Sequence, residues 1–379
     1  MSATQTPIRF ATPDCGEMEV EAVTEVNRSR WIVGGPKLQQ LENIFQDRTG
    51  AKNAIGISSW TTGAFLTLHA LGIGPGDEVL APSLSFIATV NVVRHVGATP
   101  VFVDVDPHTW NLDPADVEAK VTPRTKAIIP VDQIGLPCDM DALNEIARHH
   151  GLHVIQDAAC AVGSIYKDGE VGGNAEVAVF SLHARKIVTT GEGGMIVTDN
   201  DDLARQLRLL SHQGMSLSDV ERHGGPSTQF EEYPVVGFNF RLTDIQAAIG
   251  IPQMERLDSM LAIRRRLGST YQAAFADEPG VITPAVLPGC QPNWQSYMIR
   301  VAPHAPRNRN EVMKALDAAG IPTRRGIMAS HREAPYANPA TELPHTDEIT
   351  DSTILLPIHN QLSEDQQTYI IENVIKATE

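Results

Sequence analysis

One lysine stands in a stretch whose other residues suit a loop at the edge of a sheet. Lys186 lies within VFSLHARKIVTTGEGGM, between a Ser-x-His segment and a glycine-rich turn. The runs AIIPVDQIG and HVIQDAAC precede it and MIVTD follows it, and such β-branched runs bounded by turn residues are typical of buried strands. We therefore place Lys186 on a loop just outside a sheet, where open α/β sheets bind their ligands.

A lysine on such a loop is by itself most simply a solvated charge. A different interpretation comes from Asp157, which closes the strand VIQD upstream, and from the hydroxyl-rich helix start Ser58-Ser59-Trp60-Thr61-Thr62. These are the groups that pyridoxal phosphate needs. The lysine amine forms a Schiff base with the aldehyde, the acid keeps the pyridine nitrogen protonated, and the N–H groups of a helix N-terminus bind the phosphate. The sequence therefore predicts this cofactor.

Two of the supporting segments also have plainer interpretations. Ser and Thr before the apolar run AFLTLHALG could simply cap a helix. Phe86, just after the strand EVLAP, could belong to the core or could stack on a flat ring. The glycines of GIGPGDEV follow a helix and precede a strand, which is the reverse of a dinucleotide-binding loop, so we expect no NAD site.

Strand and helix patterns alternate along the first part of the chain, which predicts an α/β fold with a mostly parallel sheet covered by helices. From about Pro284 the pattern changes to that of a smaller α+β domain. We predict a large cofactor-binding domain over residues 1–255, with an N-terminal arm, and a small domain over 256–379. Residues Gly214–Val235 are polar and predict an irregular, mobile loop of the kind that contributes to sites.

The composition limits the partners of this chain. Its 379 residues are 42% hydrophobic and 20% charged, which is typical of a globular protein. A formal net charge of −16 argues against nucleic acid as a partner. The four cysteines lack C-x-x-C spacing, so we predict no metal site. No apolar run has the length of a membrane span and no signal peptide is recognisable, so we expect a cytoplasmic protein with reduced thiols.

Several motifs occur together in one order: Ser59-x-Thr61, GIGPGDEV, PSLSFIAT, GATPVFVDVD, IQDAACAVG, SLHARK with TTGEGG, and GFNFRLTDIQAAIG. This ordered set resembles the DegT/DnrJ/EryC1/StrS family of pyridoxal-phosphate sugar aminotransferases, from about Trp31 to Pro357. The resemblance implies the fold type I architecture of aspartate aminotransferase. It also implies a homodimer with its sites at the interface.

The resemblance assigns roles by position. Lys186 would carry the cofactor and shuttle protons, Asp157 would pair with the pyridine nitrogen, and His183 would support them. The remaining cofactor contacts that it implies are Phe86 on the ring, Thr61, Thr62 and Ser181 on the phosphate, and Asn239 on the partner subunit's phosphate. Arg241 is a candidate for the amino donor's carboxylate.

Two positions depart from the family pattern. Trp60 stands where glycine is frequent, which puts the conformation of the phosphate-binding loop in question. Cys160 stands where glutamine or histidine often contacts the ring hydroxyl, and a thiol is a poor donor. We treat Cys160 first as a small buried side chain and second as a neighbour of the cofactor.

The implied reaction moves an amino group from glutamate or glutamine to a keto sugar, which we expect to be nucleotide-activated. Adjacent positive charge from Arg185 could lower the pKa of Lys186, although a solvated Arg185 is the plainer interpretation. The alternatives are an aminotransferase or dehydratase acting on a cyclitol or another cyclic ketone, and a non-catalytic regulator. Sugar dehydratase relatives replace the lysine with histidine, so Lys186 counts against that branch.

Four residues near the C-terminus are candidates for the substrate pocket. Arg324 and Arg325 would suit a diphosphate, although a surface pair is the plainer interpretation. His331 and His359 are predicted to be solvated or locally hydrogen-bonded loop residues.

Overall fold

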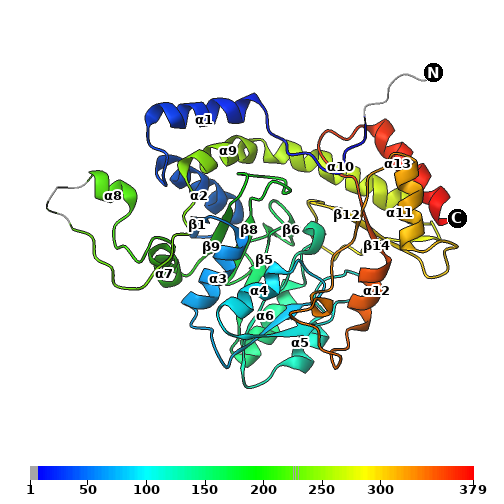
Figure 1. The fold of residues 1–379 in the computed structure, drawn as a ribbon, viewed down its shortest axis with the longest axis horizontal. Coiled ribbons are helices and arrows are strands. Elements are labelled where there is room, and N and C mark those ends of the chain that lie inside the picture. Colours follow the sequence, from blue (N-terminus) through cyan, green and yellow to red (C-terminus); the bar gives the residue numbers. More distant parts are fainter. Residues whose placement is uncertain (1–6, 225, 227, 229) are drawn as a thin grey trace.

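The computed structural model of the chain describes residues 7–379 apart from 225, 227 and 229. Its centre is a seven-stranded sheet in the order β1-β9-β8-β5-β4-β2-β3 (Figure 1). The strands are parallel except β9, which runs antiparallel to both of its neighbours. Their bounds are β1 Asn53–Ile57, β2 Glu78–Pro82, β3 Thr99–Val103, β4 Thr125–Ile128, β5 His153–Asp157, β8 Val177–Ser181 and β9 Gly194–Thr198.

Alternate residues of these strands enter different cores, as the two-residue period of a strand requires. In β8, Val177 and Val179 pack against one face of the sheet, whereas Ala178 and Phe180 pack against the other. Helices α3 (Trp60–Ala70), α4 (Ala88–His95) and α7 (Asp201–Ser211) cover the first face. The second face is covered by α2 (Pro36–Thr49), α5 (Pro114–Lys120), α6 (Met140–His150) and α9 (Asp244–Glu255).

Side-chain caps fix where several of these helices begin. Ser59 accepts from the N–H of Thr62 at the start of α3, and Asn200 accepts from two N–H groups at the start of α7. Caps of this kind each contribute about 1 kcal/mol. At the other end of the chain, Ser363 and Gln366 form a capping box at the start of α13, which spans Glu364–Thr378.

A second, four-stranded sheet lies near the C-terminus, in the antiparallel order β10-β12-β14-β13. Its strands are β10 Val281–Ile282, β12 Tyr297–Val301, β13 Arg324–Arg325 and β14 Thr353–Leu356. Residues of α10 (Leu257–Phe275), α11 (Arg309–Ala318) and α13 share its core. A short helix, α12 (Pro344–Ser352), and a 3₁₀ turn, η2 (Ser330–Arg332), lie in the same part of the chain.

A third, three-stranded sheet combines strands from the two parts of the chain. Strand β11 (Cys290–Gln291) pairs with β6 (Ile165–Tyr166), which pairs with β7 (Gly169–Glu170). The α/β architecture with a mostly parallel large sheet and a smaller α+β region is therefore confirmed. The boundary between residues 255 and 256 stays a prediction. It falls where α9 ends and α10 begins, and these helices follow each other directly.

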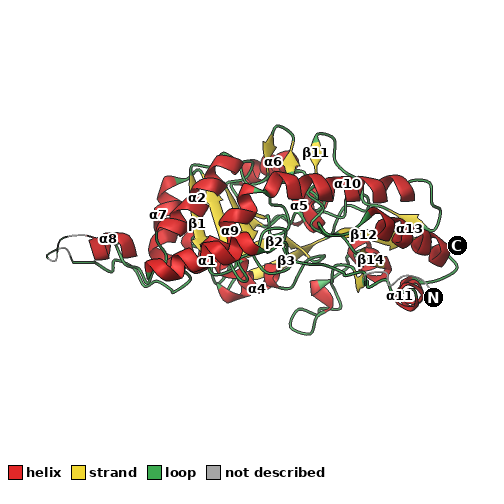
Figure 2. Ribbon diagram, turned by 90° about the horizontal axis from the view of Figure 1, so that it is seen from above, coloured by secondary structure: helices red, strands yellow, loops and turns green. Residues whose placement is uncertain are grey.

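The segment between α7 and α9 projects from the body of the molecule (Figures 1 and 2). It carries α8 (Asp219–Gly224). The predicted loop Gly214–Val235 therefore contains a short helix, and its residues 225, 227 and 229 lie outside the described residues. Helix α1 (Glu17–Ser29) packs on α9, and the turn η1 (Gln133–Gly135) follows β4. Within the described part of the chain, no helix combines the length and the apolar character needed to cross a membrane.

Candidate active site

Asp157 and Lys186 come from neighbouring parallel strands of the large sheet. Asp157 is the last residue of β5, and its register partner on β8 is Val179. Lys186 follows β8 in a tight turn, in which its N–H donates to the carbonyl of His183 at 2.9 Å. The two residues lie close enough that the lysine charge affects the carboxyl, as described next.

Asp157 is a buried acid with few but well-placed donors. Its side chain is 4% exposed, and it accepts hydrogen bonds from Thr89 Oγ1 at 3.0 Å and from the N–H of Ala159 at 3.1 Å. Burial raises the pKa of Asp157 to about 6, against the opposing effects of the Ala159 N–H, the Lys186 charge and Thr89. A carboxylate that is costly to ionise is stabilised by a cationic partner, so Asp157 fits a protonated pyridine nitrogen.

Phe86 provides a bare aromatic surface just after β2. It is 71% exposed, although Leu84 and Ser85 before it are buried. Ser85 Oγ lies 2.8 Å from Thr89 Oγ1, so a pair of hydroxyls links the Phe86 segment to Asp157. Thr89 was not singled out from the sequence, although it belongs to the PSLSFIAT motif. An exposed ring beside a buried acid fits a flat heteroaromatic cofactor.

The lysine amine contacts a thiol. Lys186 Nζ donates to Cys160 Sγ at 3.0 Å, and Cys160 is half-buried. His183 belongs to the same turn: its Nδ1 accepts from the N–H of Arg185, and its Nε2 lies 3.7 Å from a carboxylate oxygen of Glu192. Cys160 is therefore a neighbour of the lysine amine, which is the second of the two interpretations made from the sequence.

The start of α3 is organised as a capping box. Ser59 Oγ accepts from the N–H of Thr62, and Thr62 Oγ1 accepts from the N–H of Ser59. The N–H groups of Trp60 and Thr61 are among those that a helix leaves without intrahelical acceptors, which suits a phosphate. Trp60 is buried in the core on the first face of the sheet, so the bulky side chain that replaces glycine is accommodated there. Ser181, at the end of β8, accepts from the N–H of His183.

A second buried acid lies behind Asp157 and was missed from the sequence. Asp132 is fully buried and accepts hydrogen bonds from the N–H of Cys138 and from Gln156 Nε2, each at 2.9 Å. Burial raises the pKa of Asp132 to about 7, and the Asp157 charge adds to this. The N–H of Asp132 donates to the carbonyl of Asp157. Nothing local in VDQIG distinguishes such an acid from one at a turn.

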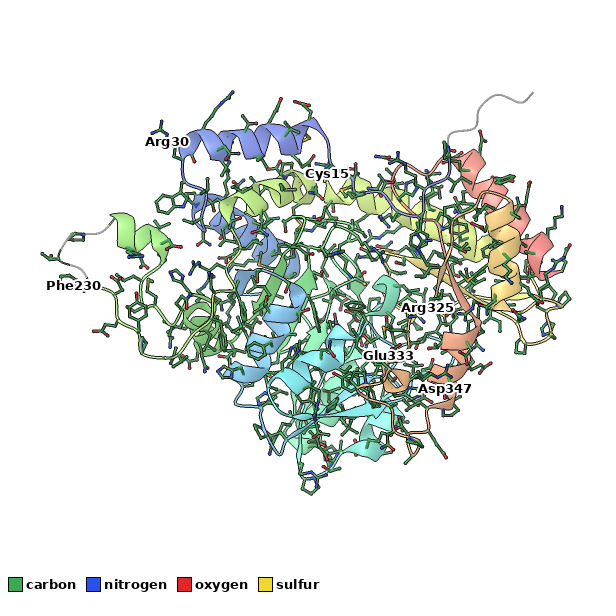
Figure 3. All side chains as sticks on the ribbon, viewed as in Figure 1. Cys15, Arg30, Phe230, Arg325, Glu333 and Asp347 are labelled. Atoms are coloured by element: carbon green, nitrogen blue, oxygen red, sulfur yellow. The ribbon has the colours of Figure 1, made fainter. Side chains whose placement is uncertain are left out.

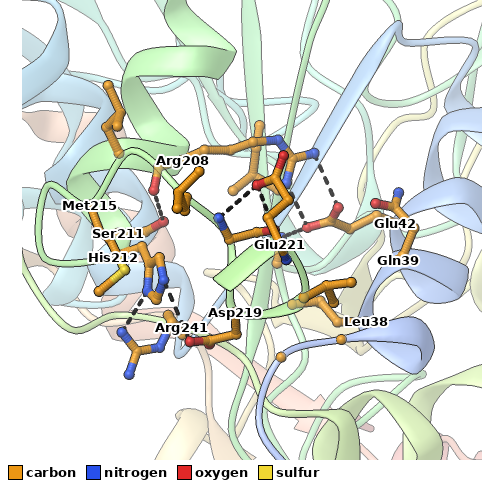
Figure 4. Close-up of a pocket in the computed structure, with 18 of the residues that line it drawn as sticks. Leu38, Gln39, Glu42, Arg208, Ser211, His212, Met215, Asp219, Glu221 and Arg241 are labelled. Atoms are coloured by element: carbon orange, nitrogen blue, oxygen red, sulfur yellow. Dashed lines mark hydrogen bonds and ion pairs between the residues drawn. The ribbon is translucent and has the colours of Figure 1, made fainter. Parts of the chain in front are cut away.

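The structure places Asn239 and Arg241 at the β1 edge of the sheet. Arg241 pairs with Ile57 at the end of β1, and Asn239 pairs with His212. Asn239 is exposed, whereas Arg241 Nη1 donates to His212 Nδ1 at 2.7 Å. Arg241 also lines a cavity of about 550 Å³ between α2, α7 and the projecting segment, where Arg208 pairs with Glu42 (Figure 4). Neither Lys186 nor Asp157 lines that cavity.

The candidates for the substrate pocket differ in their surroundings. Arg324 and Arg325 are both exposed, and Arg324 lies over the ring of Phe10 at 5.3 Å and donates to the carbonyl of Thr323. Arg185 is exposed, as its plainer interpretation has it. Of the two alternatives for the loop histidines, solvation is wrong, because His331 and His359 are buried, and each makes a hydrogen bond to a residue distant in sequence. His331 Nδ1 lies 2.6 Å from Ser83 Oγ, which belongs to a segment far away in sequence.

Exposed large apolar side chains of the described chain come from three segments only. One is Phe86, one is α1 with the turn after it, and one is the projecting segment, whose Phe230 lies at its outer end (Figure 3). The members of the last two are Met18, Val20, Ile32, Val33, Val220, Phe230, Tyr233, Val235 and Val236. Concentrated apolar exposure of this kind marks a surface that another surface covers.

Comparison with known proteins gives one consistent result. The sequence profile of the DegT/DnrJ/EryC1/StrS aminotransferase family matches residues 13–375. The chain is 43% identical to GDP-perosamine synthase of Caulobacter vibrioides over 94% of both proteins. It is 39% identical to the spore coat polysaccharide biosynthesis protein SpsC of Bacillus subtilis, over 96% of this chain and 95% of that protein. The structure resembles the PMP form of a putative sugar aminotransferase, Spr1654 of Streptococcus pneumoniae, with a TM-score of 0.91, 28% identity, and coverage of 98% and 99% of the two chains.

Proposed function

Because this chain belongs to the DegT/DnrJ/EryC1/StrS aminotransferase family, we propose that it moves an amino group from glutamate or glutamine to a nucleotide-activated keto sugar. The chain is a pyridoxal-phosphate-dependent aminotransferase of amino-sugar biosynthesis, with the fold type I architecture. The observation that carries the proposal is that the Lys186 charge acts on the buried Asp157 carboxyl, which Thr89 and Ser85 link to the segment of the exposed Phe86 ring.

Each of these residues has a defined task in the proposal. When bound, pyridoxal phosphate supplies an electrophilic aldehyde and an electron-withdrawing ring. Asp157 holds its charge against the ring nitrogen, and Phe86 covers one face of the ring and excludes water from it. Lys186 Nζ takes the proton from the α-carbon of the amino donor and returns a proton to the acceptor side. The N–H groups at the start of α3 hold the phosphate.

The acceptor is proposed from the relatives rather than from the geometry. GDP-perosamine synthase, at 43% identity over nearly all of both chains, is named for a nucleotide-linked amino sugar. That relationship supports a nucleotide-linked acceptor over a free cyclitol ketone. The donor, glutamate or glutamine, is proposed from the family resemblance alone.

The protein is proposed to act as a homodimer. The apolar side chains exposed on the projecting segment and around α1 support this. Exposed apolar patches mark interaction surfaces, and a second copy of the chain would cover these side chains. Asn239 and Arg241 lie at the base of the projecting segment and are proposed to act at the partner's site, on the phosphate and on the donor's carboxylate respectively.

The test is spectroscopic and then chromatographic. Wild-type protein with pyridoxal phosphate should develop a visible absorption band that Lys186→Ala lacks, and glutamate or glutamine should convert it to the pyridoxamine form. The loaded protein is then offered keto sugars linked to GDP, UDP or dTDP, with a cyclitol ketone as the comparison. Regeneration of the visible band by a nucleotide-linked sugar alone supports the proposal. Regeneration by the cyclitol ketone alone contradicts it.

A further inference from the structure

A segment from outside the large sheet holds the backbone on both sides of Lys186. Gln295 Oε1 accepts from the N–H of Ile187 at 2.8 Å, and Gln295 Nε2 donates to the carbonyl of Arg185 at 2.8 Å. Gln295 is only 8% exposed. We infer that Gln295 is a positioning residue for Lys186, and that the segment Asn293-Trp294-Gln295 sets the place of the lysine amine.

The same segment also binds the backbone of Cys160, whose thiol contacts this amine. Asn293 Nδ2 donates to the carbonyls of Cys160 and Val162, at 2.9 and 2.8 Å. Asn293 Oδ1 accepts from the backbone N–H of Gln295 at 2.8 Å, which ties the Asn293 side chain to the backbone of Gln295. Since Lys186 Nζ lies 3.0 Å from Cys160 Sγ, both members of that contact are held by one short stretch of chain.

The segment is itself held rigidly. Arg264 of α10 is 5% exposed, and its Nη1 donates to the carbonyls of Trp294 and Gln295 at 3.0 and 3.3 Å. Trp294 adopts a left-handed conformation, with φ of 51°. A non-glycine residue in that region is strained and persists only where its surroundings enforce it.

Two glycines leave the space that this conformation needs. A Cβ on Gly268 would lie 2.2 Å from the Trp294 ring, and a Cβ on Gly135 would lie 1.9 Å from Asn293 Oδ1. Gly135 also has φ of +94°, so a side chain there would be strained as well. The close packing on both sides argues that the segment occupies a single position, as a positioning element must.

A purely structural role would not require the pattern of contacts that Gln295 makes. The oxygen and the nitrogen of its side-chain amide each bind one of the two residues that flank Lys186. Most buried polar side chains instead form hydrogen bonds with whichever partner lies nearest. Gln253 of α9 provides a natural comparison, because it binds the N–H and the carbonyl of Thr189 in the same manner, three residues further along. A displacement of about 1 Å at a reacting group can cost about 100-fold in rate, so small shifts of this turn matter.

The test uses variants that remove or change the two hydrogen bonds. Gln295→Met has nearly the same shape and makes neither bond. Gln295→Glu keeps the acceptor for Ile187, but only its protonated form can donate to the carbonyl of Arg185. Gln367→Met is the matched control, because Gln367 is also buried and donates to a backbone carbonyl, that of Leu267, within the C-terminal core.

The readouts are the affinity for pyridoxal phosphate and, in the protein without cofactor, hydrogen exchange of the peptide that contains Ile187. We expect Gln295→Met to weaken cofactor affinity about tenfold or more and to speed exchange at Ile187, with Gln367→Met changing neither. We expect Gln253→Met to have the same effects to a smaller degree. For Gln295→Glu, the affinity relative to wild type should recover as the pH falls and the glutamate becomes protonated.

Wild-type affinity and unchanged exchange in Gln295→Met would overturn the inference. If that variant fails to fold, Gln295→Glu still decides, since a ratio to wild type that does not vary with pH contradicts the positioning role. The inference rests on the proposed attachment of the cofactor to Lys186. Borohydride reduction of the loaded wild type followed by peptide mapping tests that attachment separately, because label on another lysine would refute it whatever Gln295 does.

Discussion

The Lys186 turn and the projecting segment are both proposed to contribute to active sites, but they bury their side chains to very different degrees. In the turn, residues 187–190 are buried, and two glutamines from other elements bind its backbone. In the projecting segment, Phe230 is 79% exposed and Val236 is 89% exposed. At the base of that segment, Phe238 packs edge-on against Phe65 of α3.

This difference separates a region that is stabilised by contacts within one chain from a region whose apolar side chains lack an opposing surface. The lysine, its acid and their supporting residues are fixed by contacts within a single chain. The apolar side chains of the projecting segment have the composition of an interface without an opposing surface. Changes in the turn should therefore act within each chain, whereas changes in the projecting segment should act through assembly.

The largest effect is expected from Lys186→Ala. Loss of the amine that is proposed to hold the cofactor and move the proton should lower activity by at least about 10³-fold, with little change in stability because the side chain is only half-buried. Amino-transfer assays and thermal unfolding measure the two effects.

Mixing two impaired variants sharpens this prediction. If sites are shared between subunits, Lys186→Ala mixed with Asn239→Ala should regain activity after subunit exchange, since one site of each mixed dimer is intact. Failure to regain activity under conditions that exchange subunits would mean that Lys186 and Asn239 of one active site come from the same chain. The proposed difference between the two regions would then be wrong.

Asp132→Asn should change how stability depends on pH. The pKa of Asp132 is about 7 in the folded protein, against about 3.9 for an unperturbed aspartate, so the folded state binds this proton more tightly. Its contribution is fully present below about pH 4 and is lost as the pH rises to about 7. Relative to the variant, wild type should lose up to about 4 kcal/mol of unfolding free energy over that window.

Urea unfolding of the cofactor-free protein at several pH values measures this difference. Asp199→Asn is the control, because it removes an equal charge from an exposed side chain. A parallel pH dependence for wild type and Asp132→Asn would mean that Asp132 titrates as an ordinary carboxyl.

The double variant Phe230→Asp, Val236→Asp tests whether the projecting segment forms the dimer interface. Central apolar contacts of an interface are each worth about 2 kcal/mol, so the dimer should dissociate at protein concentrations at least about 30-fold higher than for wild type. Sedimentation across a concentration series measures this, and the unfolding free energy of the monomer should stay unchanged. A dimer of unaltered strength would place the interface elsewhere.

The smallest effect is expected from Thr89→Val, which removes one hydroxyl donor from Asp157. One hydrogen bond to a buried carboxyl is worth on the order of 1 kcal/mol, so cofactor affinity should fall about fivefold. Thr67→Val is the matched control, since Thr67 is also buried and its hydroxyl donates to the carbonyl of Gly63. Equal losses in both variants would show that Thr89 acts on stability alone.

The sequence was sufficient for features that are encoded locally. Buried strands have apolar runs between turn residues, so the parallel sheet and the positions of Asp157 and Lys186 at its edge followed from pattern alone. Features that depend on long-range contacts left no such pattern. Gln295 lies 108 residues from Ile187, and His331 lies 248 residues from the serine that keeps it buried. The inward direction of the Trp60 ring likewise depends on the packing of α3 against the sheet.

The segment Asn293–Gln295 also bears on how freely parts of this protein can be exchanged. A fragment that ends at residue 255 would contain every residue of the proposed cofactor site, yet it would lack the side chains that hold the backbone beside Lys186. In a chimera that takes its C-terminal part from a relative, residues 293–295 of the relative would contact the lysine turn of this chain. Recombination should therefore succeed when residues 293–295 are inherited from the same parent as residues 185–187. The parts of this fold that must be exchanged together thus cross the boundary between its two main sheets.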